Sequence, residues 1–438
     1  MRLQGTSRVN SKGVLEIGGC STVELAEKYG TPLWIYDEAL IRETCRRLRD
    51  SFMKYGESMI LYASKAFLTM AMCKIVQEEG LGLDVVSGGE IYTALRANFP
   101  MEKVYFHGNN KSIEELELAV NKSIGRIVVD NFFEMDILNK IGAEKAKKIP
   151  ILLRLTPGVE AHTHEYIKTG QIDSKFGFTL PNGQAKEALR KALALPYLDV
   201  KGIHCHIGSQ IFELESYSFA VSLMISFAAE TKEETGYCIE ELNLGGGLGI
   251  YYTKDDEPPS IESYADTVMS TVKQACQERF LPVPKVIVEP GRSIAGPAGT
   301  TLYKVGSIKN IPEVRKYVAV DGGMNENIRP ALYEAKYEVY AANKMLDKLI
   351  EKVTITGKCC ESGDILAWNV LVPNLEPGDL LAMTSTGAYG YAMSGNYNRL
   401  PKQAVVLVYE GLSEIIVKRE TYDDLLKNDL IPSRLSNI

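Results

Sequence analysis

The stretch SMILYASKAF, residues 58–67, opens the part of the chain that decides the fold, and KVIVEPGR, residues 285–292, closes it. Between them, short apolar runs alternate with longer segments whose apolar residues recur every three or four positions, as in repeated βα units. Several runs, such as Ile151-Leu152-Leu153, are apolar on both faces, like strands between a barrel interior and a ring of helices. We predict an α/β fold, a (β/α)8 barrel of the TIM type, with strands at 58–64, 82–86, 104–107, 126–129, 150–155, 200–207, 241–244 and 285–288.

A second, mostly β domain is predicted on either side of the barrel. After Pro297 the chain carries extended runs rich in Val, Ile, Thr and Tyr that Gly and Pro separate, which indicates an antiparallel β-barrel or sandwich. A helix-like segment at 22–29 and a strand-like segment at 33–36 precede the barrel, and we assign them to this β domain. The expected domains are therefore 37–296, and 1–36 with 297–438. The expected strands of the second are 301–305, 317–320, 352–355, 380–384 and 404–409.

Composition narrows the class of protein. The 49 basic and 56 acidic residues give a net charge of −7, and no basic block is present, so nucleic acid is not expected as a partner. The N-terminus lacks the apolar segment of a signal peptide, and the longest apolar stretch, residues 219–229, is too short to span a bilayer. Eight cysteines at irregular spacings favour reduced thiols over a disulfide framework or a zinc site. We expect a cytoplasmic protein without a membrane partner.

Chemically rich residues follow the expected strands. The reactive groups of a TIM-type barrel lie at the C-terminal ends of its strands, so the residues found there form one candidate set. A single lysine or histidine at such a place is more often a solvated charge or a satisfied core residue. Here seven of the eight ends carry a titratable or glycine-rich group: Lys65, Asp84, His107, Arg154, the run from His204 to Ser209, Gly245-Gly246-Gly247 and Glu289-Pro290-Gly291-Arg292.

Three of these groups together suit a phosphorylated pyridine cofactor. A glycine run after a strand exposes backbone N–H groups that can cradle a phosphate, although such runs also make plain turns. Lys65 stands between apolar neighbours, so burial could lower its pKa and make it an amine nucleophile that forms a Schiff base. Glu289 could keep a pyridine nitrogen protonated. These are the requirements of pyridoxal 5'-phosphate.

Two alternatives stay open at this point. His204 and His206 would lie on the same face of their strand, and His162 and His164 are also two apart, so a barrel metallohydrolase is conceivable. Such an enzyme needs neither the glycine run nor Lys65, and we expect no metal. The other alternative is a protein that only binds and carries pyridoxal phosphate.

The motifs taken together resemble the fold type III, alanine-racemase-like pyridoxal phosphate decarboxylases, and among them the diaminopimelate decarboxylases. The matching segments follow the family's order over nearly the whole chain. They are YASKA at 62–66, Asp84 to Glu90, HTHEY at 162–166, SKFGF at 174–178, His204 to Gln210, Gly245 to Gly249, Glu289 to Ser293, CESGD at 360–364 and GAYG at 387–390.

The resemblance implies roles for individual residues. Lys65 corresponds to the internal-aldimine lysine, His206 to the histidine that stacks on the cofactor ring, and Glu289 to the partner of the pyridinium nitrogen. Cys360 resembles the proton donor that quenches the carbanion left by CO₂, and the family places it in the partner subunit of a homodimer with a shared active site. The remaining implied cofactor contacts are Asp84, Ser209, Gly245, Gly246, Gly247, Pro290, Gly291, Arg292 and Tyr389.

The group at the far end of the substrate distinguishes the candidate substrates. A selective pocket for diaminopimelate must bind both an ammonium and a carboxylate, whereas ornithine and arginine end in a cation alone. The resemblance implies that Arg292, Arg329 and Tyr333 bind the distal carboxylate, that Glu361 binds the distal amine, and that Tyr389 contacts substrate as well as cofactor. The expected reaction is decarboxylation of meso-2,6-diaminopimelate to L-lysine and CO₂, the last step of lysine biosynthesis.

Overall fold

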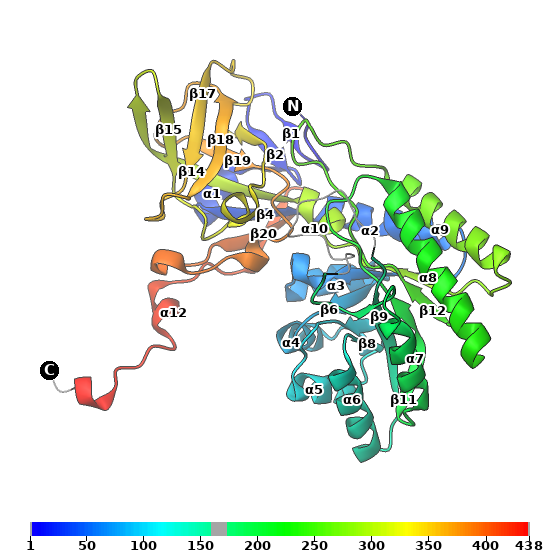
Figure 1. Cartoon of the computed structure of the whole chain (residues 1–438). Helices are drawn as coiled ribbons and strands as arrows, with labels where there is room; N and C mark the ends of the chain where they lie inside the picture. The colour runs from blue at the N-terminus through cyan, green and yellow to red at the C-terminus, as the bar shows by residue number, and fades with distance from the viewer. Residues whose placement is uncertain (1, 159–172, 437–438) are drawn as a thin grey trace. The chain divides into compact units, whose positions relative to one another are not determined.

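A computed structural model describes residues 2–158 and 173–436. The chain forms two compact units, and each is described by itself. We call Ile41–Gly296 the barrel unit, and Met1–Leu40 together with Pro297–Ile438 the β unit. Figure 1 shows the course of the chain through both.

The barrel unit is a closed ring of parallel strands. Consecutive strands pair in parallel register, and the ring closes where β13 pairs with β5 and β8 pairs with β9. The short β10 (Phe178–Thr179) adds to β9 outside the ring. The predicted (β/α)8 barrel is therefore confirmed. Its strands are β5 (Ser58–Ala63), β6 (Gly82–Val85), β7 (Val104–Phe106), β8 (Arg126–Val129), β9 (Ile149–Thr156), β11 (Leu198–His204), β12 (Glu241–Asn243) and β13 (Lys285–Val288).

Helices surround this ring (Figure 1). Many begin at a polar residue whose side chain accepts a hydrogen bond from the first turn, as Thr69, Ser87, Ser112, Asn131 and Ser260 do. Such a cap satisfies a backbone N–H that has no partner within the helix. The helices are α2 (Glu38–Met53), α3 (Met70–Glu78), α4 (Gly88–Arg96), α5 (Ile113–Asn121), α6 (Phe132–Glu144), α7 (Gln184–Ala194), α8 (Leu214–Thr235), α9 (Ile261–Glu278) and α10 (Arg292–Ala298).

The predicted sixth strand is too long at its end. We expected residues 200–207, but β11 ends at His204. Cys205 still donates its N–H to the carbonyl of Asn243, whereas the chain from His206 onward leaves the ladder. Ile203, Cys205 and Ile207 keep alternating with two histidines past the end of the ladder, so the sequence pattern alone misplaced this boundary.

The β unit is built around the long strand β14 (Gly299–Ile311). It pairs with β4 (Leu33–Asp37) on one side and β15 (Arg315–Val320) on the other, so the N-terminal segment lies inside the main sheet. The sheet is mostly antiparallel, with parallel pairs at β4/β20 and β15/β17. Its other strands are β16 (Val339–Ala341), β17 (Glu351–Thr356), β18 (Ile365–Val372), β19 (Leu380–Met383), β20 (Ala404–Tyr409) and β21 (Leu412–Val417).

Smaller elements complete the β unit. A separate three-stranded sheet is formed near the N-terminus, and three short helices lie in the connections and the C-terminal segment. The strands β16, β18 and β21 were not predicted. The sequence of β18 is apolar apart from Asn369, and Trp368 and Leu371 on it are exposed. The smaller elements are β1 (Arg8–Val9), β2 (Leu15–Ile17), β3 (Cys20–Ser21), α1 (Thr22–Tyr29), α11 (Arg329–Tyr333) and α12 (Tyr422–Leu426).

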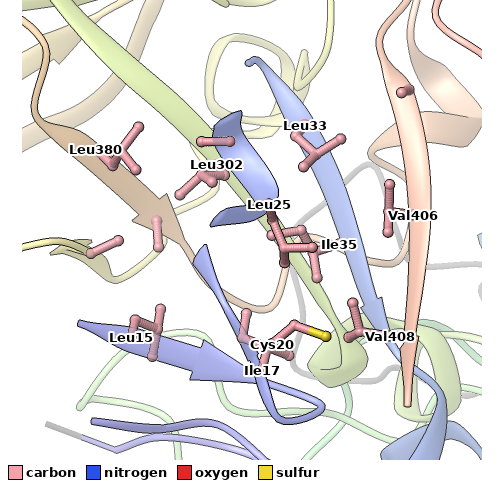
Figure 2. Packing of buried hydrophobic residues seen from close by; sticks show 14 residues of the cluster. Leu15, Ile17, Cys20, Leu25, Leu33, Ile35, Leu302, Leu380, Val406 and Val408 are labelled. Carbon is pink, nitrogen blue, oxygen red and sulfur yellow. The ribbon is translucent and has the colours of Figure 1, made fainter. Parts of the chain in front are cut away.

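The hydrophobic core of the β unit contains residues from both the N-terminal and the C-terminal parts of the chain. Figure 2 shows Leu33 and Ile35 of β4 beside Leu302 of β14 and Val406 of β20, and all four side chains are fully buried. Leu25 of α1 packs into the same cluster. Burial of each such side chain contributes about 1.5–3 kcal/mol. The N-terminal residues are therefore part of the hydrophobic core of this unit.

Two whole-chain properties bear on the sequence expectations. In the described ranges, no helix combines the length and the apolar character needed to cross a bilayer. All eight cysteines are free thiols. Cys360 is exposed, and the other seven are buried or half-buried.

Candidate active site

Glu289 lies at the centre of the group formed at the strand ends of the barrel unit. It follows β13 and is only 6 % exposed. Asn243, the last residue of β12, donates from Nδ2 to Glu289 Oε1 at 2.6 Å, and His204 Nε2 lies 3.2 Å from Oε2. His107 Nε2 lies 2.9 Å from Oε1. Residues at three other strand ends of the ring, those of β7, β11 and β12, therefore contact this one carboxylate.

The protonation states in this group follow from burial and from its contacts. Burial lowers the pKa of His204 to about 4, so the imidazole is neutral near pH 7 and can donate Nε2–H to Glu289. Burial alone would raise the pKa of Glu289, but the adjacent His107 and His204 and their hydrogen bonding hold it well below its usual range. Glu289 is consequently a carboxylate whose negative charge is fixed inside the barrel.

Asp84 of β6 brings a second carboxyl group to the same place. Its Oδ1 lies 3.6 Å from His107 Nε2, and the residue is 2 % exposed. Burial raises the pKa of Asp84, and the charge of Lys65 opposes this shift. Among the described residues Asp84 Oδ1 has no hydrogen-bond partner. A buried polar atom without a partner is costly, so Asp84 fits a site that a polar ligand completes.

The glycine run after β12 packs against neighbouring backbone. A Cβ at Gly246 would lie 2.2 Å from the carbonyl oxygen of Glu289, and one at Gly245 would lie 2.7 Å from the carbonyl oxygen of Cys205. Gly245 also has φ +67°, where a side chain is strained. The Gly245 N–H donates to Asn243 Oδ1 at 2.9 Å and the Gly246 N–H to His206 Nδ1 at 3.2 Å. Two of the three amides expected to cradle a phosphate are thus engaged within the protein here.

Arg292 and Ser209 form a polar pair at the adjoining strand ends. Arg292 donates from Nη2 to Ser209 Oγ at 2.9 Å and from Nη1 to the Tyr252 hydroxyl at 2.6 Å. It is 6 % exposed, so it is not a surface charge. Gly291, just before it, leaves room for Ala63: a Cβ there would lie 2.8 Å from the Ala63 Cβ. The ends of β5, β11 and β13 therefore meet closely, and Pro290 accepts the Ala63 N–H at 3.1 Å.

Lys65 departs from its expected environment. It lies in the single turn Ser64–Ala66 at the end of β5, as predicted, and both of its neighbours are buried. Its own side chain is exposed. The burial expected of this lysine is therefore not seen in the described chain. Burial lowers the pKa of His206 well below its usual range, and the nearby positive charge of Lys65 lowers it further.

The structure does not bring His204 and His206 together as a pair of metal ligands. β11 ends at His204, which turns to Glu289, while His206 Nδ1 accepts from Gly246. The His/Cys/Asp/Glu group found close enough to hold an ion, in the described part of the chain, is His107, His204 and Glu289. His162 and His164 lie outside the described residues.

The β unit carries the other expected residues. Cys360 and Glu361 are exposed in the loop between β17 and β18, where Cys360 N–H donates to Asn398 Oδ1 at 2.7 Å. Arg329 begins α11, is 7 % exposed and donates to the Tyr337 hydroxyl. Tyr333 is half-buried at the end of the same helix.

Tyr389 occupies a tight turn of the β unit. It has φ +60°, an uncommon conformation for a residue with a side chain. The turn is fixed on both sides: Tyr36 donates its hydroxyl to Gly387 O at 2.7 Å, and a Cβ at Gly390 would lie 2.2 Å from the Trp34 ring. A strained turn held by two buried aromatic residues is typical of a functional site.

Comparison with known proteins assigns the chain to a family. Residues 38–296 match the family model "pyridoxal-dependent decarboxylase, pyridoxal binding domain". Diaminopimelate decarboxylase of Bacillus subtilis is 53% identical over 98% of both chains. The chain belongs to the diaminopimelate decarboxylase family. It is therefore a member of a family of pyridoxal-dependent carboxy-lyases.

Solved structures of this family share the architecture. A crystal structure of diaminopimelate decarboxylase from M. jannaschii in complex with L-lysine matches with a TM-score of 0.93 and 36% identity, covering 98% of this chain and 99% of that one. The enzyme from Helicobacter pylori, also complexed with L-lysine, matches with a TM-score of 0.85 and 31% identity, covering 92% and 98%.

Sequence reasoning missed two residues of the site. Asn243 is the residue that links Glu289 to the glycine run, and Tyr252 is the residue that orients Arg292. A polar residue at the end of a strand, two positions before a glycine run, was the available signal for Asn243. Tyr252 lies in an irregular segment, so no periodicity could mark it.

Proposed function

We propose that this chain decarboxylates meso-2,6-diaminopimelate to L-lysine and CO₂ with pyridoxal 5'-phosphate as cofactor, and that it does so in the cytoplasm. The observation that carries the proposal is the buried, ionised Glu289 held by Asn243, His107 and His204, in a chain 53% identical to a diaminopimelate decarboxylase. A fixed negative charge of this kind suits the protonated nitrogen of a pyridine ring.

The barrel residues fit the cofactor. Asp84 Oδ1 is a buried polar atom without a hydrogen-bond partner in the described chain, and Gly246 and Gly291 keep the walls free of side chains. When bound, pyridoxal phosphate supplies an electron sink for the electron pair left as CO₂ departs. Lys65 Nζ would hold it covalently and Glu289 would hold a proton at the ring nitrogen. His206 would lie against the ring.

The phosphate would be held by residues of three strand ends. Ser209 and Arg292 offer a hydroxyl and a guanidinium that already contact each other, and Gly245, Gly246, Gly247, Pro290 and Gly291 form the adjoining backbone. Because the Gly245 and Gly246 amides donate within the protein here, we expect Gly246 N–H to exchange His206 Nδ1 for a phosphate oxygen.

The β unit supplies most of the residues that we propose bind the substrate, and the residue that we propose transfers the proton. We propose that it also carries residues of the dimer interface. Arg329 and Tyr333, with Arg292 of the barrel unit, would bind the distal carboxylate, Glu361 the distal amine, and Tyr389 both substrate and cofactor. Cys360 would give its proton to the α-carbon after CO₂ has left. We propose a homodimer in which Cys360 and Glu361 serve the partner's barrel.

Release of CO₂ by the purified chain with added pyridoxal phosphate tests the proposal. The assay compares meso-diaminopimelate, L-ornithine and L-arginine side by side. Release from diaminopimelate alone, with L-lysine as product, is expected. Release from another amine would keep the cofactor and refute the substrate, whereas cofactor binding without any release would favour a carrier.

A further inference from the structure

The loop that presents Cys360 is held by two side chains that have no place in the proposed chemistry. We define the Cys360 loop as residues 357–364, between β17 and β18. Asp364, at its end, is 3 % exposed and turns back into the loop. Its Oδ2 accepts the Cys359 N–H at 2.8 Å and its Oδ1 accepts the Met324 N–H at 2.7 Å. One carboxylate therefore ties the loop to the segment that follows β15.

Glycines make this close approach possible. A Cβ at Gly357 would lie 2.2 Å from Asp364 Oδ2, and a Cβ at Gly323 would lie 2.5 Å from the same atom. Gly357 N–H also donates to the Asp364 carbonyl at 3.0 Å, and Lys358 N–H donates to Gly322 O at 2.8 Å. The base of the loop is consequently closed by backbone and carboxylate contacts that a larger residue would prevent.

Asn398 holds the next residue from outside the loop. Its Oδ1 accepts the Cys360 N–H at 2.7 Å, from a turn in which Asn398 has φ 52° and ψ 24°. Asparagine tolerates this left-handed conformation better than other residues that carry a side chain. The backbone N–H groups of Cys359 and Cys360 are thus each bonded to a side chain of a different residue, although Cys360 and Asn398 are both exposed.

We propose that Asp364 and Asn398 are positioning residues that fix the backbone under Cys360, so that its thiol delivers the proton after CO₂ has left. The inference rests on the proposed function. In that step the bond between the α-carbon and the carboxylate has broken, its electron pair stays with the α-carbon, and the proton moves from Cys360 Sγ to that carbon. Water then returns a proton to the thiolate. A displaced loop slows this transfer and leaves CO₂ release unchanged.

Asn398→Gly is the decisive variant, because glycine removes the acceptor and accepts the left-handed backbone. Loss of one hydrogen bond of ordinary strength corresponds to about a five-fold change in an equilibrium. In single-turnover mixing of the holoenzyme with diaminopimelate, we expect lysine formation to slow about five-fold while CO₂ release stays within about two-fold of the parent. Asn398→Asp keeps the acceptor and should restore lysine formation.

Two controls separate positioning from general damage. Asn369→Gly changes an exposed asparagine of β18 that also has a left-handed backbone, φ 54°, and should leave both rates unchanged. Hydrogen exchange of the cofactor-free protein gives a readout without activity: the Cys360 amide should exchange faster in Asn398→Gly than in Asn369→Gly. Three results would each overturn the inference. In Asn398→Gly, CO₂ release and lysine formation could slow equally, or lysine formation could stay unchanged. In Asn398→Asp, the rate of lysine formation could fail to recover.

Cys360→Ala distinguishes the failure of this inference from that of the proposed function. If Cys360→Ala slows lysine formation and Asn398→Gly does not, the positioning role is refuted and the role of Cys360 stands. If Cys360→Ala leaves lysine formation in step with CO₂ release, both roles are refuted although the chain is a decarboxylase. Absence of CO₂ release by the parent chain would refute the proposed function itself.

Discussion

Replacing Asn243 by alanine should weaken both the barrel and its cofactor site. Asn243 is fully buried, donates to the ionised Glu289 at 2.6 Å and accepts the Gly245 N–H at 2.9 Å. A hydrogen bond to a charged group contributes about 1.5–3 kcal/mol, and a buried N–H left without a partner costs about 1–3 kcal/mol. These terms overlap, so the free energy of unfolding of the barrel unit should fall by about 3 kcal/mol.

The assay must report on the barrel unit. Both tryptophans, Trp34 and Trp368, belong to the β unit, so their fluorescence follows the wrong part of the chain. Circular dichroism at a helical wavelength is suitable, because α3 to α9 all belong to the barrel unit. Urea unfolding of the cofactor-free protein gives the stability, and titration with pyridoxal phosphate gives Kd. A less firmly held Glu289 should raise Kd at least about ten-fold, or about 1.4 kcal/mol.

Asn343 provides a matched control in the β unit. It donates from Nδ2 to Asp379 Oδ1 at 2.9 Å and accepts the Leu380 N–H at 2.9 Å, the same pair of bonds that Asn243 makes. Asn343→Ala should therefore lower the stability of the β unit and leave Kd for pyridoxal phosphate unchanged. If Asn243→Ala keeps its stability within about 0.5 kcal/mol and binds the cofactor as the parent does, Asn243 does not support Glu289.

Four further changes test other parts of the site. Lys65→Ala should abolish turnover and the yellow absorbance of the covalently held cofactor; persistence of that absorbance would refute the lysine assignment. Gly246→Ala should prevent cofactor binding or folding, because its Cβ would lie 2.2 Å from Glu289 O, whereas Gly89→Ala, with its nearest contact at 3.7 Å, should be tolerated in the same assays. Because burial lowers the pKa of His204 to about 4, the unfolded chain binds more protons between pH 4 and 6.5, so barrel stability should fall as the pH drops through this window; His204→Gln should flatten the dependence measured by urea unfolding. Arg329→Ala should raise KM for diaminopimelate while Kd for pyridoxal phosphate stays the same, and unchanged kinetics would move the distal carboxylate site elsewhere.

Much of the fold could be predicted from the sequence because its elements are local patterns. Strands 126–129 and 285–288 and helix 22–29 were predicted with the bounds that the structure has, since each is an apolar or amphipathic run between clear breaks. The end of β11 was not, because apolar residues keep alternating with histidines beyond the last ladder partner. Strand β18 was not predicted, although its sequence is apolar apart from Asn369.

The sequence by itself determined which chemical groups stand at the strand ends of the barrel. Lys65, Asp84, His204 and Glu289 follow from strand order alone, because parallel strands bring their C-terminal ends to one side. Only the tertiary structure decided how these groups pair. Contacts such as that of Glu289 with Asn243 join residues 46 positions apart, and the exposure of Lys65 depends on what surrounds it. No local pattern encodes such contacts, since distance and burial are properties of the packed chain.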